Sequence, residues 1–354
     1  MTSTPFFTAA ETSRRKLVEL DAPIVHAAGN VYRDTDFVVS PRFEQTSVCA
    51  ALYAHTGHAP FSIRNCTFRT LAPTWNLEWA RDPLWSNFAG LRLASPKDLV
   101  IDGLHVENFP GSALSAGGIE GATLKRISTT RCMMGLNIGW PSRRVVLDYL
   151  RVWDTWGPGP GVLPGFGGSP SLARPGGFTG GDGVAAYLDD SALRYLEFAG
   201  EMYTGIKLCR SKRVQLLKVV TPSMMIQGTQ LRHTNVDGST DGTEAIEIRG
   251  LYLDKRIGGS AASDGANGIQ VSWHVTGLDV RDFALFAGGK NGHGVQLWGD
   301  VSAVFRGGIF EGWNGNRGGA PAYAMEIGDG STLNADFESA NQFFSQDRIL
   351  RRAG

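Results

Sequence analysis

Acidic and basic residues that could transfer protons recur through the middle of the chain, each at or beside a short strand-like phrase. The candidates for catalysis are Asp182, Lys207, Glu244, Glu247, Arg249 and His293. A Lys or His side chain can remove a proton beside a carboxylate, while Arg stabilises the enolate that develops. Two carboxylates can instead hydrolyse a glycosidic bond when they lie about 5 Å or about 6.5 to 9.5 Å apart. Glu244 and Glu247 could form such a pair, and so could Asp182 with a neighbour.

Amide, aromatic and basic side chains accompany these groups and could bind a substrate. The residues expected to do so are Asn137, Trp156, Tyr187, Arg210, Asn267, Gln270, Gln296 and Trp298. Glu244 and Glu247 could also hold a Ca²⁺ ion, because carboxylate oxygens are ligands that this ion prefers. Solvent-facing strands carry Gln, Glu and Lys by default, so the argument depends on the whole cluster rather than on any one member.

A recurring phrase predicts the elements that would position these residues. A small residue is followed by apolar, polar and apolar residues, and the phrase starts at Gly90, Ala113, Gly135, Gly183, Gly205, Met225, Ala245, Gly268, Gly294 and Ala324. The period-two alternation predicts a strand with one side buried. Most steps between starts are 20 to 30 residues, and such a period indicates a solenoid whose units pack only against their neighbours.

Most units carry a second alternating run after the phrase, for example residues 99–106 and 278–283. Helical periodicity occurs only over residues 8–20, which could form a capped helix that closes the end of the stack. We therefore expect an all-β fold, a single-stranded right-handed parallel β-helix with an N-terminal capping helix. The expected division is a cap and first strands over residues 1–59, the β-helix over 60–344, and a tail over 345–354.

Stacking of the phrases in register would place their polar residues in an outward column, about 4.8 Å apart along the axis. That column reads Arg92, Ser115, Asn137, Ala185, Lys207, Gln227, Glu247, Gln270, Gln296 and Glu326. Neighbouring columns would add Asp182, Glu244, Asn267 and His293 on one side and Tyr187, Arg249 and Trp298 on the other. We therefore expect one cleft that carries both Lys207 and Glu247. The Gly- and Pro-rich insertion at residues 157–181 would form its wall, because long loops in compact repeats are usually functional.

The coils, with Gly before an apolar-polar-apolar strand, resemble the right-handed parallel β-helix proteins of the pectate lyase-like superfamily over roughly residues 60–340. The resemblance implies a long glycan as ligand, since the superfamily contains polysaccharide lyases, glycoside hydrolases, sugar epimerases, phage tail spikes and adhesins. Gly292-His293-Gly294 matches one motif of polygalacturonase-like hydrolases, but their other motifs are not reproduced. Residues 243–250 resemble one coil of alginate lyase-like proteins, in which Lys and Arg catalyse beside bound calcium.

We expect an enzyme that cleaves a polysaccharide, with elimination favoured over hydrolysis. The alternative is a non-catalytic phage tail spike or glycan-binding structural protein, which could be a homotrimer, and a third possibility is a repeat scaffold without a sugar ligand. Exposed tryptophans near the cleft would favour a glycan ligand over a scaffold.

Composition limits the partners and the compartment. The 34 basic and 34 acidic residues balance, so no general attraction to nucleic acid or to an anionic membrane is expected. The four cysteines match no zinc-ligand spacing. No signal peptide or membrane-spanning segment is recognised. We therefore expect a virion-associated or cytoplasmic protein, extracellular only if a signal was removed.

Overall fold

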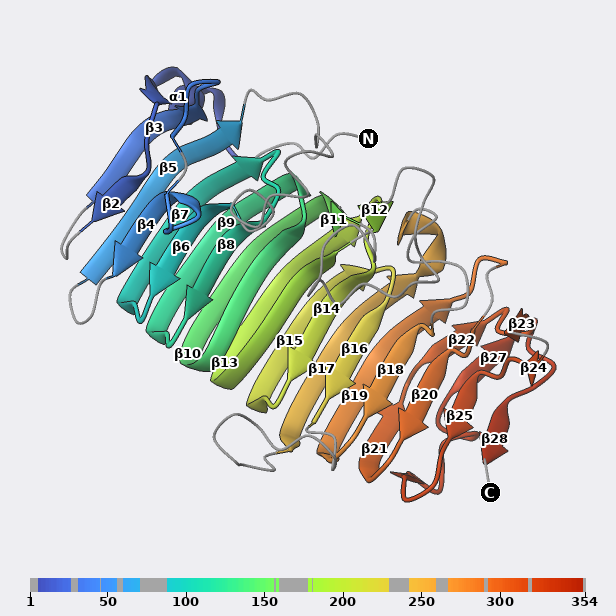
Figure 1. Cartoon of the computed structure of the whole chain (residues 1–354). Helices are drawn as coiled ribbons and strands as arrows, with labels where there is room; N and C mark the ends of the chain where they lie inside the picture. Colours follow the sequence, from blue (N-terminus) through green and yellow to red (C-terminus); the bar gives the residue numbers. More distant parts are fainter. Residues whose placement is uncertain are drawn as a thin grey trace.

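The computed structural model describes residues 6–26, 31–44, 46–55, 60–70, 88–155, 157–158, 178–179, 181–228, 242–258, 267–289, 292–317 and 320–352. Parallel strands from successive coils stack side by side from the blue to the red end of the chain (Figure 1). The strand pairing divides the stack into three faces, called here face 1, face 2 and face 3. The expected parallel β-helix is thus confirmed.

Face 1 contains the strands that carry the repeated phrase, except for the phrase at residues 245–248. Its strands are β2 (Ile24–His26), β4 (Ala50–His55), β6 (Ala89–Ala94), β8 (Ser112–Gly117), β14 (Thr204–Cys209), β16 (Met224–Gln227), β18 (Ile269–Ser272), β20 (Val295–Trp298), β25 (Met325–Ile327) and β28 (Leu350–Arg352), with the first residues of β10 (Met134–Thr155) and β13 (Asp182–Ala199).

Faces 2 and 3 share long strands that bend at a corner, and β10 and β13 continue into both. The other long strands are β3 (Val31–Val39), β5 (Pro60–Thr70), β7 (Lys97–Glu107), β9 (Glu120–Cys132), β15 (Lys212–Thr221), β17 (Thr243–Asp254) and β19 (Val275–Phe286). Face 2 ends with β21 (Val301–Arg306) and β26 (Thr332–Leu333), and face 3 also contains β1 (Lys16–Leu20), β22 (Ile309–Glu311) and β27 (Gln342–Phe344).

A few short elements lie outside the stack of parallel strands. They are the helix α1 (Ala9–Ser13), the 3-10 helix η2 (Lys255–Gly258), and two antiparallel pairs, β11 (Gly157–Pro158) with β12 (Phe178–Thr179) and β23 (Asn316–Arg317) with β24 (Ala320–Pro321). Pairing within the stack includes β1 at one end and β28 at the other, so the solenoid extends beyond residues 60–344 on both sides.

The core is built from inward columns of aliphatic side chains. One column on face 2 runs through Leu124, Leu147, Leu193, Leu216 and Ile248, which pair in register and are fully buried. Alternation explains this arrangement, because successive side chains on a strand point to opposite sides and only one side faces the interior. The four cysteines are free and buried.

The small residue that opens each phrase is required by the spacing of the coils. A Cβ atom on Gly183 would lie 2.6 Å from the carbonyl oxygen of Gly205 and 2.5 Å from Cδ1 of Phe198. The same clash recurs further along, where a Cβ on Gly268 would lie 2.6 Å from the carbonyl oxygen of Gly294. Gly183 and Gly268 are therefore required for close backbone approach, since neither has a positive φ.

The corner between faces 2 and 3 places one residue of each coil in the left-handed region. The φ angles of these aligned residues lie between 49° and 79°, and the residues are Asp34, Asn65, Gly103, Arg126, Tyr149, Tyr195, Lys218, Gly250, Asp282 and Gly307. Asn, Asp and Gly suit this conformation, whereas Tyr, Arg and Lys are strained in it.

The predicted N-terminal cap is wrong in extent and in place. The capping box at Thr8 and Glu11 forms, but α1 covers only Ala9–Ser13, and the following Lys16–Leu20 pairs with β3 as strand β1. Glu11 accepts a hydrogen bond from Arg126 at 2.9 Å, and its backbone carbonyl accepts one from Asn65 at 2.8 Å. These contacts hold the helix against the flank of the coils, because the strand that follows it already occupies the end of the stack.

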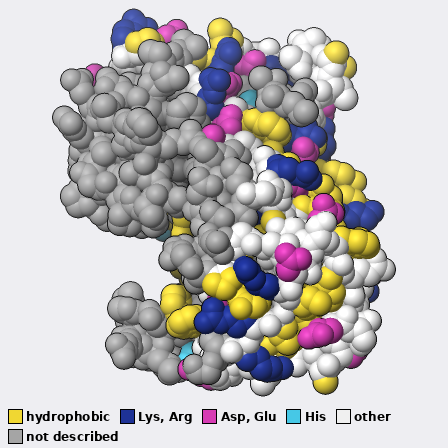
Figure 2. All heavy atoms as spheres, turned by 90° about the vertical axis from the view of Figure 1, so that its right-hand side faces the viewer, with side chains coloured by type: hydrophobic (Ala, Val, Ile, Leu, Met, Phe, Trp, Pro, Cys, Tyr) yellow, Lys and Arg dark blue, Asp and Glu magenta, His cyan; other side chains and the backbone are white. Residues whose placement is uncertain are grey.

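Charged side chains of both signs are interspersed with apolar ones on the described part of the flank shown in Figure 2. The mixture agrees with the formal net charge of zero. Among the described residues, no helix is long and apolar enough to cross a membrane.

Candidate functional site

The first part of the polar column on face 1 has the predicted register. Strand pairing aligns Arg92 with Ser115 and Ser115 with Asn137. It then continues through Ala185 to Lys207. The prediction for these coils is confirmed.

The predicted column is wrong at Gln227 and Glu247, but it is correct again from Gln270 to Glu326. Lys207 pairs with Met225, and Gln227 pairs with Cys209, so the phrase at residues 225–228 is displaced by two residues. Alternation alone could not fix this register, because a shift of two residues leaves the same side of the strand facing inward. The actual column continues through Gln270, Gln296, Glu326 and Arg351.

The phrase at residues 245–248 lies on face 2 and not on face 1. It belongs to β17, which pairs with β15 and β19, and β17 also carries Glu244, Glu247 and Arg249. The prediction of one cleft carrying both Lys207 and Glu247 is therefore wrong. Period-two alternation shows which side chains point inward, but this pattern is the same on every face of a solenoid.

Asp182 opens β13 and is the acidic group at the centre of face 1. It pairs with Thr204 of the next coil, which also gives it a side-chain hydrogen bond. The Oδ1 atom is buried and has no hydrogen-bond partner among the described residues. Burial raises the pKa of this carboxyl group, against the opposing effects of the Lys207 charge and the Thr204 hydrogen bond. Asp182 therefore keeps its proton to a higher pH than an exposed Asp.

Lys207 lies one coil from Asp182, on β14. Burial by itself lowers the pKa of its ammonium group, but the charge of Asp182 and smaller contributions from Cys209, Tyr187 and Tyr203 together raise it by more, so the pKa lies above its ordinary value. The two shifts place the groups within electrostatic reach of each other in a poorly solvated part of face 1. A carboxyl group and an amine in such surroundings are suited to proton transfer.

Arg210 and Tyr187 lie at the carboxyl end of the same two strands. The guanidinium carbon of Arg210 lies 5.4 Å from the centroid of the Tyr187 ring. Burial raises the pKa of Tyr187 and of its neighbour Cys209. Two predicted basic residues, Lys207 and Arg210, are thus brought to one part of face 1 with Asp182 and Tyr187.

Three other predicted residues form a polar network further along face 1. Nε2 of His293 lies 3.1 Å from the Glu326 carboxylate, and the Gln296 amide donates to the same carboxylate at 2.6 Å. The Asn267 amide donates to Oε1 of Gln296 at 2.6 Å. Because the backbone N–H of Tyr323 donates to Nδ1 of His293 at 3.1 Å, Nε2 carries the imidazole proton and donates to Glu326.

This network is separate from the groups around Lys207. Three strand steps lie between Lys207 and Gln296, which is about 14 Å at ~4.8 Å per step. The side chains of His293 and Glu326 are only 7% and 12% exposed. His293 is therefore not placed to act on a group bound at Lys207, and any catalytic role for it stays a prediction.

The remaining predicted binding residues on face 1 are more accessible. Trp298 is 56% exposed at the end of β20, where it pairs with Ser272. Gln270 is half-buried in the central column, and Asn137 is half-buried two steps before Lys207. Trp156 and most of the insertion at residues 157–181 lie outside the described residues.

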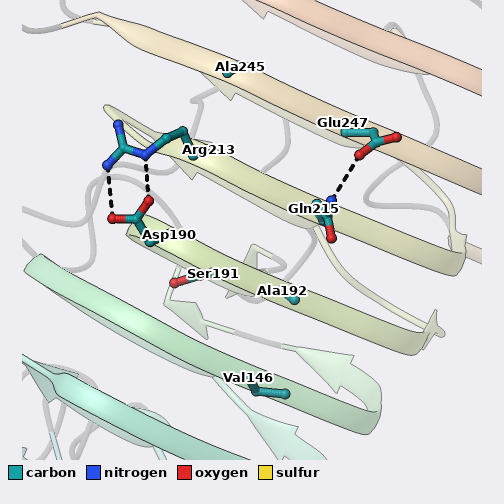
Figure 3. A pocket seen from close by; sticks show the side chains of 8 residues that line it. All are labelled: Val146, Asp190, Ser191, Ala192, Arg213, Gln215, Ala245 and Glu247. Atoms are coloured by element: carbon teal, nitrogen blue, oxygen red, sulfur yellow. Dashed lines mark hydrogen bonds and ion pairs between the residues drawn. The ribbon is translucent and has the colours of Figure 1, made fainter.

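A hollow of about 370 Å³ lies on face 2 (Figure 3). Arg213 forms one wall with Asp190, donating to it through Nε at 2.5 Å and through its second nitrogen at 2.9 Å. On the other wall, the Gln215 amide donates to Glu247 at 3.0 Å. The floor consists of small side chains, those of Val146, Ala192 and Ala245.

The carboxylates of this hollow are paired with cations. The hydrogen bond and charge of Arg213 lower the pKa of Asp190. Glu247 forms an ion pair with Arg249 of its own strand. Asp190 is therefore ionised near neutral pH and lacks the raised pKa that a general acid needs.

The predicted calcium ligands do not form a cage in the described part of the chain. Glu244 lies 3.8 Å from the Lys212 ammonium, and Glu247 is engaged by Arg249 and Gln215. The described residues contain no group of three or more His, Cys, Asp or Glu side chains that could hold a metal ion. The calcium site stays a prediction, and no step of the chemistry below depends on it.

Sequence reasoning missed two pairs that the structure brings together. Glu326 stood in the predicted column but was not assigned a role, and Arg351, which lies 3.5 Å from it, was not considered. Asp190 and Arg213 are 23 residues apart, which is one coil of the repeat. Opposite charges separated by one repeat length were a signal that could have found this pair.

No protein-family model matches the chain, and no curated protein matches it. Similar solved structures include the surface adhesin PfbA of Streptococcus pneumoniae, at 9% identity over 94% of this chain and 86% of the other, with a TM-score of 0.47. An endo-xylogalacturonan hydrolase from Aspergillus tubingensis matches at 11% identity over 95% and 83%, with a TM-score of 0.40.

A GH136 lacto-N-biosidase from Eubacterium ramulus matches at 9% identity over 96% of this chain and 62% of the other, with a TM-score of 0.36. Similarity at this level is too low to assign a function. The fold described above depends on the strand pairing of the chain itself.

Proposed function

We propose that the protein binds an acidic polysaccharide along face 1 and cleaves it by β-elimination at Lys207. The observation that carries this proposal is the placement of Asp182 and Lys207 on adjacent strands of face 1, where each shifts the pKa of the other, with Arg210 directly after the strand of Lys207. Lys207 is the base that removes the proton from C5 of a uronic acid. Arg210 binds the uronate carboxylate and stabilises the enolate that forms.

In this mechanism Asp182 and Lys207 together supply both an acid and a base. Transfer of a proton from the ammonium to the carboxylate creates a neutral amine and a carboxylic acid without changing the net charge. Burial favours the neutral pair because it disfavours both charged forms. The amine can then take the C5 proton, and the acid can donate to the leaving oxygen.

The bonds and charges of this reaction balance without an oxidant or reductant. The C5–H bond and the bond between C4 and the glycosidic oxygen break, and a double bond forms between C4 and C5. The proton from C5 stays on Lys207, and the leaving oxygen receives a proton from Asp182. A proton passes back from Lys207 to Asp182 after the products leave.

Hydrolysis by two carboxylates has less support on this face. The strand segments at residues 134–139, 182–188, 204–209 and 224–227 carry a single carboxylate, that of Asp182. A second carboxylate within about 9.5 Å would be needed on the opposite side of the bond. Glu244 and Glu247, which were expected to form such a pair, lie on face 2.

The test is to incubate the protein with polygalacturonate, alginate, hyaluronate and neutral glucans, with and without calcium. Both the ultraviolet absorbance of unsaturated uronates and the number of reducing ends are recorded. We expect both to increase on a uronate polymer, and the initial rate to rise toward alkaline pH because Asp182 raises the pKa of Lys207. Reducing ends without the absorbance would show hydrolysis instead, and no change on any polymer would contradict cleavage.

A further inference from the structure

The hollow on face 2 adjoins two exposed tyrosines on the same coils. Tyr149 and Tyr195 occupy the corner three residues after Val146 and Ala192, which form the floor of the hollow. Their rings are stacked, with centroids 4.7 Å apart and planes within 4°. From Asp190 to Tyr195 the strip runs for about 16 Å along β13, at ~3.3 Å per residue.

The backbone at these tyrosines is strained although their side chains are not buried. Their φ angles are 57° and 55°, and their side chains are 46% and 41% exposed. Except for Arg126 and Lys218, the other coils place Asn, Asp or Gly at the same corner, where such residues fit without strain. Burial of the rings in the core does not explain why tyrosine stands at both positions. A ligand that contacts exposed rings does explain it.

The charges around the hollow are already neutralised by partners. Arg213 pairs with Asp190, and Arg249 pairs with Glu247. A charged ligand would have to displace one of these partners to gain an ion pair. Hydroxyl groups can add hydrogen bonds to the remaining lone pairs and N–H groups of the same planar side chains without breaking them.

The floor of the hollow suits the apolar side of a sugar ring. Val146, Ala192 and Ala245 present methyl groups between the two polar walls. The volume of about 370 Å³ lies at the low end of the range for sites that bind small molecules. Apolar floor, neutral polar walls and adjacent aromatic rings together match a polyhydroxylated ring without net charge.

We propose that the hollow and the tyrosine pair form a second binding site, on face 2, for a short neutral saccharide segment. The site shares no residue with the Asp182 and Lys207 region, and it does not depend on the proposed elimination. The site would bind either a polymer that the protein does not cleave or a neutral segment of the polymer that it cleaves.

The first test measures binding of cellohexaose, maltohexaose, laminarihexaose and xylohexaose to the whole chain by titration calorimetry and saturation-transfer NMR. We expect at least one to bind. Ala192→Phe fills the hollow and should weaken that binding about tenfold, whereas Ala192→Ser keeps the floor small and should retain it. The circular dichroism and melting temperature of both variants verify that they are folded. Binding of none of the four sugars would overturn the proposal.

The second test uses Tyr195→Asn, which removes the ring and suits the left-handed corner. Affinity should fall while the melting temperature holds, because Asn relieves the backbone strain as the ring stacking is lost. Unchanged affinity would show that the tyrosine pair is not part of the site. If Lys207→Met abolishes sugar binding and Ala192→Phe does not, the sugar binds on face 1 and the proposal is wrong.

Discussion

Asp182 on face 1 and Asp190 on face 2 belong to the same strand, β13, and their surroundings give them opposite properties. Burial raises the pKa of Asp182, and one of its oxygens has no hydrogen-bond partner among the described residues. Two hydrogen bonds from Arg213 lower the pKa of Asp190, which is exposed. Asp182 therefore keeps its proton to a higher pH, whereas Asp190 remains ionised.

The comparison shows that the face on which a carboxylate lies decides its chemistry more than its residue type does. Face 1 places an acid and an amine in a poorly solvated position, which suits proton transfer. Face 2 pairs Asp190 and Glu247 each with a guanidinium group and leaves a hollow of small side chains between the pairs. Cleavage is therefore expected on face 1 and binding alone on face 2.

The largest effect should come from removing the amine of face 1. Lys207→Met keeps most of the buried aliphatic chain, and we expect the rate of elimination to fall by about 10²- to 10⁴-fold, as for loss of a general base. The matched control is Lys212→Met, which removes a lysine that lies beside Glu244 on face 2. The rate of ultraviolet absorbance change measures both. Equal losses in the two variants would contradict the assignment of chemistry to face 1.

A stability effect of intermediate size should follow from widening the coil spacing beside Asp182. In Gly183→Ala the new Cβ meets the Phe198 ring and the Gly205 carbonyl oxygen, so we expect a loss of about 1–3 kcal/mol in the free energy of unfolding. Urea denaturation measures it. Gly117→Ala is the control, because its Cβ would have no neighbour closer than 3.9 Å. Similar losses in both would show that close approach does not determine the glycines of face 1.

The smallest effects are expected in the pH dependence of stability of two variants, Asp182→Asn and Asp190→Asn. One change should raise the stability and the other should lower it. Ionisation of Asp182 costs stability, since its pKa is raised on folding. The gain from Asp182→Asn should therefore appear as pH rises above the unfolded pKa of about 3.9 and grow up to the folded pKa. Ionised Asp190 contributes stability above its unfolded pKa. Asp190→Asn should lose that contribution near neutral pH and match the parent protein in acid, below the lowered folded pKa.

Thermal melts of the three proteins from about pH 3 to about pH 7 measure these differences. If the melting temperatures of the two variants changed with pH in the same way, Asp182 and Asp190 would not differ in the way proposed for the two faces.

The repeated phrase was sufficient to predict the fold. Its alternation defined strands, and its period defined coils that bury apolar side chains against one another. The column from Arg92 to Lys207 was also predicted correctly, because each of these phrases begins with a small residue and keeps a similar spacing.

The candidate site was only partly predictable. Asp182, Lys207, Tyr187 and Arg210 were identified and do lie together, since they come from two adjacent coils. Glu247 and Arg249 were assigned to the same cleft because their phrase has the same pattern, although β17 lies on face 2. The assignment of a phrase to a face depends on the lengths of the corners between strands, which vary from coil to coil.

The segment from Phe6 to Arg15 has a consequence for how the solenoid comes apart. Its contacts reach Asp36 on β3, Asn65 on β5, Arg126 on β9 and Arg151 on β10. In a stack where each coil touches only its neighbours, unravelling from one end would release coils one at a time. This segment ties several of them together, so the first coils should be lost as one cooperative unit after it detaches.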